Sequence, residues 1–551
     1  MNMDHYYLYR EIVSALEGFV RTYPELCDLY SIGETYEGRF IWCLTVCNEK
    51  TGAAHEKAAF FMDGNLHSGE VASSMAVLYT LDKWLSSYGK DPEITGLLDR
   101  YTVYAIPRIS ADAAEIYLTT PRTLRGSTEK YYPEESGIVP CDVDGDGTGR
   151  QMRILDPAGK WKVWEKNPDV MVPRQPDDIS GRFYTLVSEG EFRGNPKDSV
   201  NLRDARPQED LDPNRQFPFE WNMDYPDPDR PTSGPEPLHD REVQALYRFV
   251  CDHPNIVFHM NFHTYGGLHI SPAAFCPHLD APDGEAMRRL GLAMRKKTGY
   301  KCEGIFPPGA RDIAPGSYTA WEYFAKGIMA FVTELWDFHF QADPERPEQW
   351  SMFAAESEEQ FLREAETAIR WDRENNGGQG FKSWKPFDHW QLDEVGNHVE
   401  IGGWCDKFSR QNPPVHLLSG VCEKGCQAAL TGFKALPRPE ILSVGLRRQE
   451  NGTETVTVEI GNLGFLPTSG TENAFRKKLD CALTVTLGGC RMISENPVHI
   501  DKIDGFSKAR AVFTVKTPEE TDLTVTLRGQ RCGTAKAAVH IKGGVIGHVS
   551  P

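Results

Sequence analysis

The sequence predicts an α/β domain with a mixed, mostly parallel central sheet flanked by helices, followed by a C-terminal β-sandwich. In the first part, short apolar runs such as residues 59–63 and 328–335 alternate with segments of helical periodicity, which indicates strands separated by helices. In the last part, runs such as residues 455–460 alternate between apolar and polar side chains and are joined by Gly and Asn turns, which is typical of a sandwich. We therefore expect a larger domain over residues 1–435 and an accessory domain over residues 436–551.

Composition and charge exclude several classes of protein. The chain has 551 residues and a net charge of -19, so binding to nucleic acid or to an acidic membrane surface is disfavoured. Its 13 cysteines are scattered and lack the paired spacing of a zinc finger, which favours reduced thiols in a cytoplasmic protein. The N-terminus shows no basic segment followed by an apolar core, and no apolar run is long enough to cross a bilayer. We expect a cytoplasmic protein, and cationic or neutral substrates remain open.

The first elements of the larger domain follow from periodicity. Residues 9–23 carry apolar side chains at helical spacing and end before Pro24. Residues 29–33 and 39–47 are predicted to form a hairpin, and residues 101–107 another buried strand.

One strand, loop and helix contain the first candidate ligands. Residues 59–63 form an apolar strand that leads into Gly and Asn, and residues 71–85 repeat at helical spacing. His67 and Glu70 lie between them, where an imidazole and a carboxylate can converge on one cation. Such a pair supplies two of the three protein ligands of a catalytic zinc and leaves the fourth position for water. A loop histidine beside a helix-capping glutamate is the alternative.

A long insert over about residues 111–210 interrupts the pattern. It is rich in Pro, Gly, Asp and Arg and shows little periodicity, and its length indicates a functional lid or rim. Within it, Asp142, Asp144 and Asp146 resemble the start of a calcium loop, but Arg153 occupies the twelfth position, where a bidentate Glu is usual. A structural calcium and a solvated turn are both open.

A loop flanked by prolines follows the insert. It presents the amide of Asn214 and the planar guanidinium of Arg215, which suit a carboxylate or a developing oxyanion. An ordinary surface loop is the alternative.

The third candidate ligand comes from a predicted strand over residues 256–262. His263 stands where this strand ends and a Gly-rich loop begins, which makes it the preferred ligand. His259 and His269 remain alternatives. Strand alternation does not eliminate His259, because it places His259 on the same face as His263.

A candidate general base lies on the apolar strand over residues 328–335. Glu334 has apolar neighbours there, and partial desolvation would raise its pKa to suit proton transfer near neutrality. A structural glutamate at a strand end is the alternative.

Taken in this order, the residues resemble the zinc metallocarboxypeptidases of the carboxypeptidase A type. The resemblance spans about residues 5–340 and rests on Tyr36-Glu37-Gly38-Arg39, His67 to Glu70, Asn214-Arg215, His263-Thr264-Tyr265 and, after Trp321, Glu334-Leu335. It implies that His67, Glu70 and His263 bind zinc and that Glu334 is the general base. It also implies that Asn214 and Arg215 bind the terminal carboxylate of a peptide and that Thr264 and Tyr265 contact substrate.

The resemblance also implies an oxyanion-stabilising Arg before the Asn-Arg pair. Arg122 fits best, and Arg125 is the reserve. Two departures are visible: Arg311-Asp312 stand where the family has a mobile Tyr, and the specificity position falls at about Thr319, which is neither acidic nor large and apolar.

Three functions follow as hypotheses. The first is a zinc-dependent carboxypeptidase acting on peptides with a free C-terminus, and the second is an amidase or endopeptidase on the same zinc site, for example on cell-wall peptides. The third is a non-catalytic binding protein, which the presence of every candidate ligand and of the base disfavours. The Asn-Arg pair favours the first.

Overall fold

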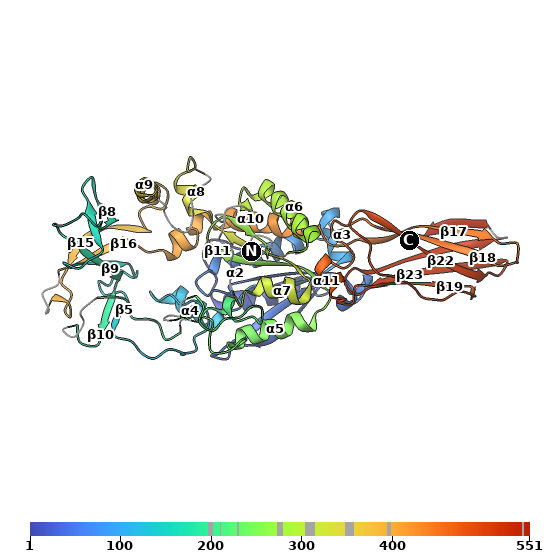
Figure 1. The fold of residues 1–551 in the computed structure, drawn as a ribbon, viewed down its shortest axis with the longest axis horizontal. Coiled ribbons are helices and arrows are strands. Elements are labelled where there is room, and N and C mark those ends of the chain that lie inside the picture. Colours follow the sequence, from blue (N-terminus) through green and yellow to red (C-terminus); the bar gives the residue numbers. More distant parts are fainter. Residues whose placement is uncertain are drawn as a thin grey trace.

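Three parts follow one another along the long axis of the molecule: the insert, a central α/β part and a β-sandwich (Figure 1). The computed structural model describes residues 1–196, 202–209, 211–226, 228, 231–272, 279–302, 315–347, 357–393, 398–542 and 545–550. Among these residues, no helix combines the length and the apolar character needed to cross a bilayer.

An eight-stranded mixed sheet forms the centre. Its strands, in spatial order, are β1 (Cys27–Glu34), β2 (Phe40–Val46), β4 (Thr102–Ile106), β3 (Ala59–Gly64), β11 (Ile256–Thr264), β14 (Met329–Leu335), β12 (Leu268–Ile270) and β13 (Lys301–Cys302). The pairs β4 with β3, β3 with β11, β11 with β14 and β12 with β13 are parallel, and β1 and β2 form the predicted antiparallel hairpin. The fold class expected from the sequence is confirmed.

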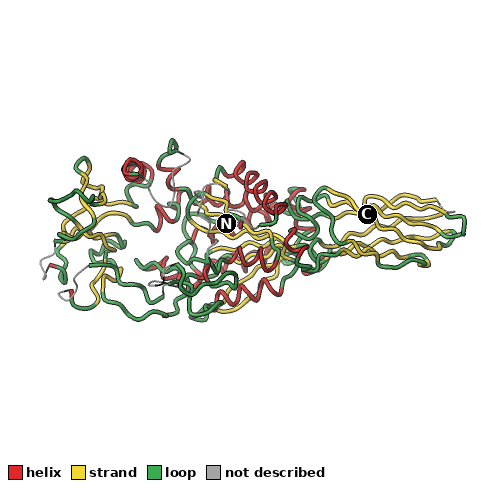
Figure 2. Tube along the Cα trace, viewed as in Figure 1, coloured by secondary structure: helices red, strands yellow, loops and turns green. Residues whose placement is uncertain are grey.

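Helices cover both faces of this sheet, as the red coils beside the yellow strands show (Figure 2). One side is called here the α2 face and carries α1 (Tyr9–Thr22), α2 (Val71–Ser87), α3 (Pro92–Arg100), α6 (Ala281–Thr298) and α10 (Val415–Phe433). The other side is called the α5 face and carries α5 (Arg241–Asp252) and α7 (Tyr318–Lys326). Phe60 and Met62 pack on the α2 face and Phe61 on the α5 face. Both sides of β3 are therefore buried, which explains its continuous apolar sequence.

The insert contains more regular structure than its sequence indicated. After α4 (Ala111–Thr119), it contributes four strands to a six-stranded sheet with the spatial order β15 (Phe381–Phe387), β16 (Val399–Trp404), β6 (Gln151–Leu155), β9 (Tyr184–Ser188), β7 (Trp161–Trp164) and β8 (Asn167–Pro173). A second, two-stranded sheet pairs β10 (Gly190–Arg193) with β5 (Gly137–Pro140). In the larger sheet Arg153 pairs in register with Glu400. Short strands with such distant partners leave little local periodicity. The helices α8 (Phe338–Ala342) and α9 (Glu358–Asn375) lie between this sheet and the central part (Figure 1).

The C-terminal part is the expected β-sandwich. One sheet has the order β17 (Pro439–Arg448), β18 (Glu454–Asn462), β22 (Ser507–Lys516) and β20 (Arg491–Met492), and the other β21 (Val498–Ile500), β19 (Leu483–Gly488), β23 (Glu520–Gly529), β24 (Gly533–Lys542) and β25 (Val545–Ser550). Every second residue along these strands points into one core between the sheets, for example Val458 of β18 and Val525 of β23. The short helix α11 (Glu472–Arg476) lies where the sandwich joins the central part. At the same junction, the buried guanidinium of Arg531 donates to the carbonyl oxygen of Gly327 at 2.8 Å.

Candidate metal centre

The loop between β3 and α2 has a backbone that few residues allow. Asn65 adopts a φ of 60°, which Asn tolerates better than most residues, and its side-chain amide donates to the carbonyl oxygen of His67 at 2.9 Å. A Cβ on Gly64 would lie 2.8 Å from the backbone of Ser73, so glycine lets α2 begin close to the strand. This loop turns His67 and Glu70 into the interior, where both are buried.

Three side chains from the ends of two neighbouring strands converge. Nδ1 of His67 lies 2.8 Å from Oε1 of Glu70, and Nδ1 of His263 lies 2.8 Å from Oε2 of the same carboxylate. The two Nδ1 atoms are 3.1 Å apart. The structure thus brings His67, Glu70 and His263 together in an arrangement able to hold one metal ion.

The two alternative histidines lie outside this cluster. His259 is enclosed between Asp63 and Glu322, 3.0 Å and 2.5 Å from its ring nitrogens. Burial opposes its protonation, but the two carboxylates outweigh burial and raise its pKa to about 10. His269 contacts the hydroxyl of Thr333, and burial lowers its pKa to about 3. Both are packed in the core.

In each converging imidazole, the ring nitrogen that points away from the cluster contacts an oxygen atom. Nε2 of His67 lies 3.1 Å from Oδ1 of Asp212, and Nε2 of His263 is hydrogen-bonded to Oδ1 of Asn261. A metal-binding histidine commonly donates its second N–H to such a partner, which fixes the tautomer and aims the other nitrogen at the metal. Sequence reasoning missed both partners, although Asn261 precedes His263 by two residues on one strand and therefore shares its face.

The charges of the carboxylates suit a cation. Burial alone would raise the pKa of Glu70, but His67 and His263 outweigh it and lower that pKa. Burial would also raise the pKa of Asp212, but nearby positive charge, mainly that of Arg125, outweighs burial and holds this pKa well below its ordinary value. Two imidazoles and one ionised carboxylate are a ligand set that zinc favours.

Glu334 lies beside this cluster. β14 runs parallel to β11, with Glu334 in register with His263, and within the described chain its Oε2 is buried without a hydrogen-bond partner. Burial raises the pKa of Glu334 to about 8; the negative charge of Glu70 adds to this rise, and the positive charge of Arg125 opposes it. The carboxyl group is desolvated, as its apolar sequence neighbours predict.

The structure brings Arg125 to the cluster and leaves Arg122 away from it. The guanidinium of Arg122 donates to Glu209 at 3.2 Å. Arg125 donates to Oε1 of Glu70 at 3.3 Å and to Oδ2 of Asp212 at 3.2 Å. A backbone hydrogen bond holds Arg125 beside the metal loop, because the N–H of Ser68 donates to the carbonyl oxygen of Arg125 at 3.0 Å. This geometry corrects the sequence-based preference for Arg122.

The candidate carboxylate-binding residues lie next to Asp212. The N–H of Asn214 donates to Oδ1 of Asp212 at 2.8 Å, and Oδ1 of Asn214 accepts from the N–H of Tyr318 at 2.9 Å. Thr319, the candidate specificity residue, is the next residue of α7 and is buried. Arg215 is half-buried in the same turn and donates to the carbonyl oxygen of Asn214 at 2.6 Å. The structure therefore groups Asn214, Arg215 and Thr319 on one side of the cluster.

Thr264 and Tyr265 continue β11 past His263. The N–H of Thr264 donates to Oε2 of Glu70 at 3.2 Å, and Tyr265 is 40% exposed at the surface beside the cluster. Arg311 and Asp312, which stand where the family has its mobile Tyr, lie outside the described residues.

The Asp-rich turn of the insert brings Asp142, Asp144 and Asp146 within reach of one ion. Their oxygens accept backbone N–H groups, as Asp142 does from Gly145 and Gly147 at 2.8 Å each, which a solvated turn also explains. Calcium binding stays a prediction.

Comparisons with known proteins agree with this site. A family model described as Zinc carboxypeptidase matches residues 12–363, more than half of the chain. A second model, described as a domain of unknown function, matches residues 438–540.

Two curated relatives show the extent of the similarity. Carboxypeptidase A2 of Rattus norvegicus is 29% identical over 141 residues, which cover 26% of this chain and 32% of the relative. Carboxypeptidase A4 of Mus musculus is 21% identical over 346 residues, covering 61% of this chain and 64% of the relative. The chain thus spans less than two thirds of the length of either relative. A solved carboxypeptidase A from Helicoverpa armigera is 14% identical, with a TM-score of 0.39 and coverage of 68% of this chain and 76% of that one.

Proposed function

Because the chain belongs to the zinc carboxypeptidase family, we propose that it is a zinc-dependent metallocarboxypeptidase that removes residues from peptides with a free C-terminus. The observation that carries the proposal is the convergence of His67, Glu70 and His263 on one point. Glu334 occupies the neighbouring strand end, in register with His263. The three candidate ligands and the candidate base thus lie at one edge of the sheet.

The residues fit zinc in their chemistry and in their support. Both histidines direct Nδ1 to the carboxylate of Glu70 and have Nε2 against an oxygen of Asp212 or Asn261. When zinc is held by two imidazoles and a carboxylate, it lowers the pKa of its water to about 7 and polarises the substrate carbonyl.

Glu334 serves as the general base in this proposal. Its Oε2 has no hydrogen-bond partner among the described residues, and its raised pKa makes it an acceptor for a proton near neutral pH. A cation in the cluster would lower this pKa by favouring the carboxylate. Glu334 would take a proton from the attacking water as the water oxygen bonds to the scissile carbonyl carbon, and it would pass this proton to the amine nitrogen as the C–N bond breaks.

Arg125 is the donor for the developing oxyanion. Its guanidinium lies against Glu70 and Asp212, so it is held in place before the carbonyl oxygen gains charge. A donor fixed in this way needs no reorganisation during the reaction.

Asn214 and Arg215 bind the terminal carboxylate. A planar guanidinium can donate two parallel hydrogen bonds to a carboxylate. Thr319 lies beside Tyr318, whose N–H binds Asn214, so we assign Thr319 to the pocket for the terminal side chain. Its small size sets no strong preference for charge.

An endopeptidase or amidase on the same zinc site is the second candidate. The insert sheet extends the molecule beyond the central part (Figure 1) and offers surface for a longer substrate. Such an enzyme would not need a terminal carboxylate.

One experiment separates these functions. The zinc content of the purified full chain is measured, and a peptide library is digested as free acids and as C-terminal amides, with products read by mass spectrometry. Loss of single C-terminal residues from free acids alone supports the carboxypeptidase. Internal cuts, or equal cleavage of amides, support the second candidate. A zinc-loaded sample that cleaves nothing leaves a binding protein.

We also propose that the enzyme acts in the cytoplasm. Apart from Cys302, the cysteines among the described residues are free thiols, which suits a reducing compartment. Recovery of the native protein in a secreted fraction would contradict this location.

A further inference from the structure

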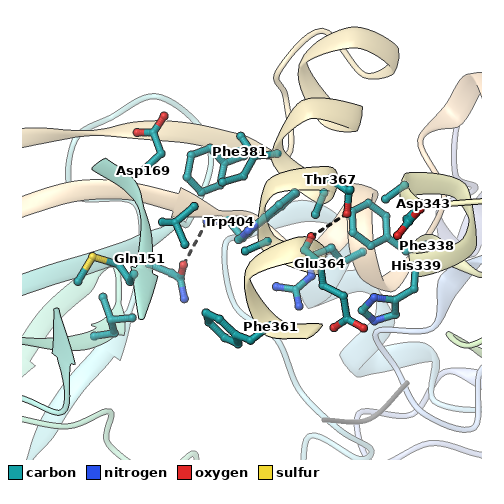
Figure 3. Close-up of a pocket in the computed structure, with 18 of the residues that line it drawn as sticks. Gln151, Asp169, Phe338, His339, Asp343, Phe361, Glu364, Thr367, Phe381 and Trp404 are labelled. Carbon is teal, nitrogen blue, oxygen red and sulfur yellow. Dashed lines mark hydrogen bonds between the residues drawn. The ribbon is translucent and has the colours of Figure 1, made fainter. Parts of the chain in front are cut away.

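A cavity of about 300 Å³ lies between α8, α9 and the insert sheet. This volume is at the lower end for pockets that hold small ligands. Figure 3 shows aromatic rings around it, and we call it the aromatic chamber. Its large apolar lining residues are Trp161, Phe338, Phe361, Phe381, Trp384 and Trp404.

The charged groups of the chamber are compensated. Glu364 pairs with Arg346 at 2.9 Å, and Asp343 pairs with Arg363 at 2.6 Å. Burial lowers the pKa of His339 to about 4, so its imidazole is neutral at pH 7. A chamber with aromatic walls and paired charges favours an uncharged apolar occupant.

The chamber is connected to the metal centre by short segments. Only four residues separate Glu334 on β14 from His339 on α8, which lines the chamber. Arg410 lines it as well, and Asn412, two residues on, donates to the carbonyl oxygen of Gly69 at 2.8 Å. Gly69 lies in the loop between His67 and Glu70. Arg410 in the chamber wall is therefore linked to the metal loop through Asn412 and this one hydrogen bond.

The core next to the chamber and the core next to the carboxylate-binding residues lie on opposite faces of the central sheet. Phe217 and Tyr318, next to Arg215 and Asn214, belong to the core on the α5 face. Phe338, at the chamber, belongs to the core on the α2 face. The metal cluster stands at the strand ends between these two faces. A peptide with its carboxylate at Arg215 and its scissile bond at the cluster would reach the chamber if its N-terminal part ran past α8, which follows β14 in the chain and lines the chamber.

We propose that the aromatic chamber binds a bulky apolar side chain of the substrate on the N-terminal side of the scissile bond. This inference rests on the proposed peptidase function and extends it to substrate selection. The insert supplies Trp161 to the chamber, and β15 and β16 supply Phe381, Trp384 and Trp404. The insert sheet thus becomes part of the substrate-binding surface.

The test compares kcat/KM across N-acylated peptides that share one C-terminal residue. A short N-acyl dipeptide, which ends before the chamber, reports the metal centre alone. In longer peptides each upstream position is changed in turn from Ala to Leu, Phe or Trp. We expect one position at which the bulky residue raises kcat/KM about 10- to 100-fold, the gain for burying one such side chain.

Two variants change the chamber in opposite directions. Ala365 lines it on α9, and Ala365→Phe fills it, so the preference should vanish. Phe361→Ala enlarges it, so the preference should move from Leu toward Trp. Glu366→Phe is the matched control, because this neighbouring residue is exposed and should retain the wild-type preference. Melting temperatures report whether each variant is folded. If Ala365→Phe does not fold, the substrate preference of Phe361→Ala tests the proposal instead.

The outcomes separate the two proposals. If the zinc-loaded wild type does not hydrolyse the short dipeptide, both the peptidase function and the chamber assignment fall. If it hydrolyses the dipeptide but shows no upstream preference, or if Ala365→Phe keeps that preference, only the chamber assignment falls. A preference for a glycan-bearing peptide over the same peptide with a bulky apolar residue also overturns it.

Discussion

Nε2 of His67 lies 3.1 Å from Oδ1 of Asp212, although 145 positions separate the two residues. The same carboxylate accepts hydrogen bonds from Arg125 at 3.2 Å and from the N–H of Asn214 at 2.8 Å. Asp212 therefore connects a proposed metal ligand, the proposed oxyanion donor and the proposed carboxylate-binding turn. A change at this residue should affect the metal before it affects the fold.

Asp212→Asn should weaken zinc binding about 10- to 100-fold, the usual effect of removing a partner of a metal-binding histidine. The amide keeps the shape of the carboxylate but loses the charge that orients His67. Zinc affinity is measured by competition with a chromophoric chelator. Asp99→Asn is the control, because Asp99 accepts from Tyr88 at 2.6 Å in another part of the fold. Equal affinity in Asp212→Asn and wild type would contradict the role.

Glu334→Gln should lower kcat about 100- to 10,000-fold, the contribution of a general base, while zinc stoichiometry stays unchanged. The amide cannot accept the proton, and Glu334 is not among the three converging ligands. Steady-state kinetics and metal analysis of the same sample give both numbers. A variant with wild-type turnover would rule out Glu334 as the base.

Arg125→Ala should lower kcat about 100- to 1,000-fold with a smaller change in KM, because an oxyanion donor acts in the transition state. Arg122→Ala should change kcat less than about fivefold, since its partly exposed pair with Glu209 contributes little. Kinetics on one substrate compare the two variants. The reverse order would restore the sequence-based preference for Arg122.

Arg215→Ala should raise KM for free-acid peptides about 10- to 100-fold, the loss of hydrogen bonds to a charged group. Cleavage of amidated peptides, where it is detectable, should not change. Arg215→Lys keeps the charge without the planar fork and should recover part of the loss. A KM that rises equally for acids and amides would place Arg215 outside the carboxylate site.

Glu242→Gln should stabilise the protein at alkaline pH. Burial, with a contribution from Asp240, raises the pKa of Glu242 from its ordinary value of 4.5 to about 8. The folded chain thus binds this proton more tightly than the unfolded chain, so the stability from Glu242 is present below pH 4.5 and declines as the pH rises through 8. The variant lacks this decline. Urea unfolding at pH 5 and pH 9 should show a larger advantage for Glu242→Gln at pH 9, and an equal difference at both pH values would contradict the assignment.

Local patterns were sufficient where an element is long and its burial is regular. The strand before His67 and the helix after it follow from side-chain periodicity, and the spacing of His67 and Glu70 is visible in the loop between them. The strands of the insert escaped this reasoning because they are short, and because Arg153 finds its partner Glu400 in a distant segment.

The sequence by itself determined the α/β part, the C-terminal sandwich and the first two candidate ligands, because these depend on residues within one or two turns of each other. Only the tertiary structure shows that His263, and not His259, lies in the cluster with His67 and Glu70, that Arg125, and not Arg122, contacts it, and that Asp212 and Asn261 bind the imidazoles. These choices depend on which strand ends and loops dock together, and a backbone hydrogen bond such as that from Ser68 to Arg125 leaves no mark in the side-chain pattern.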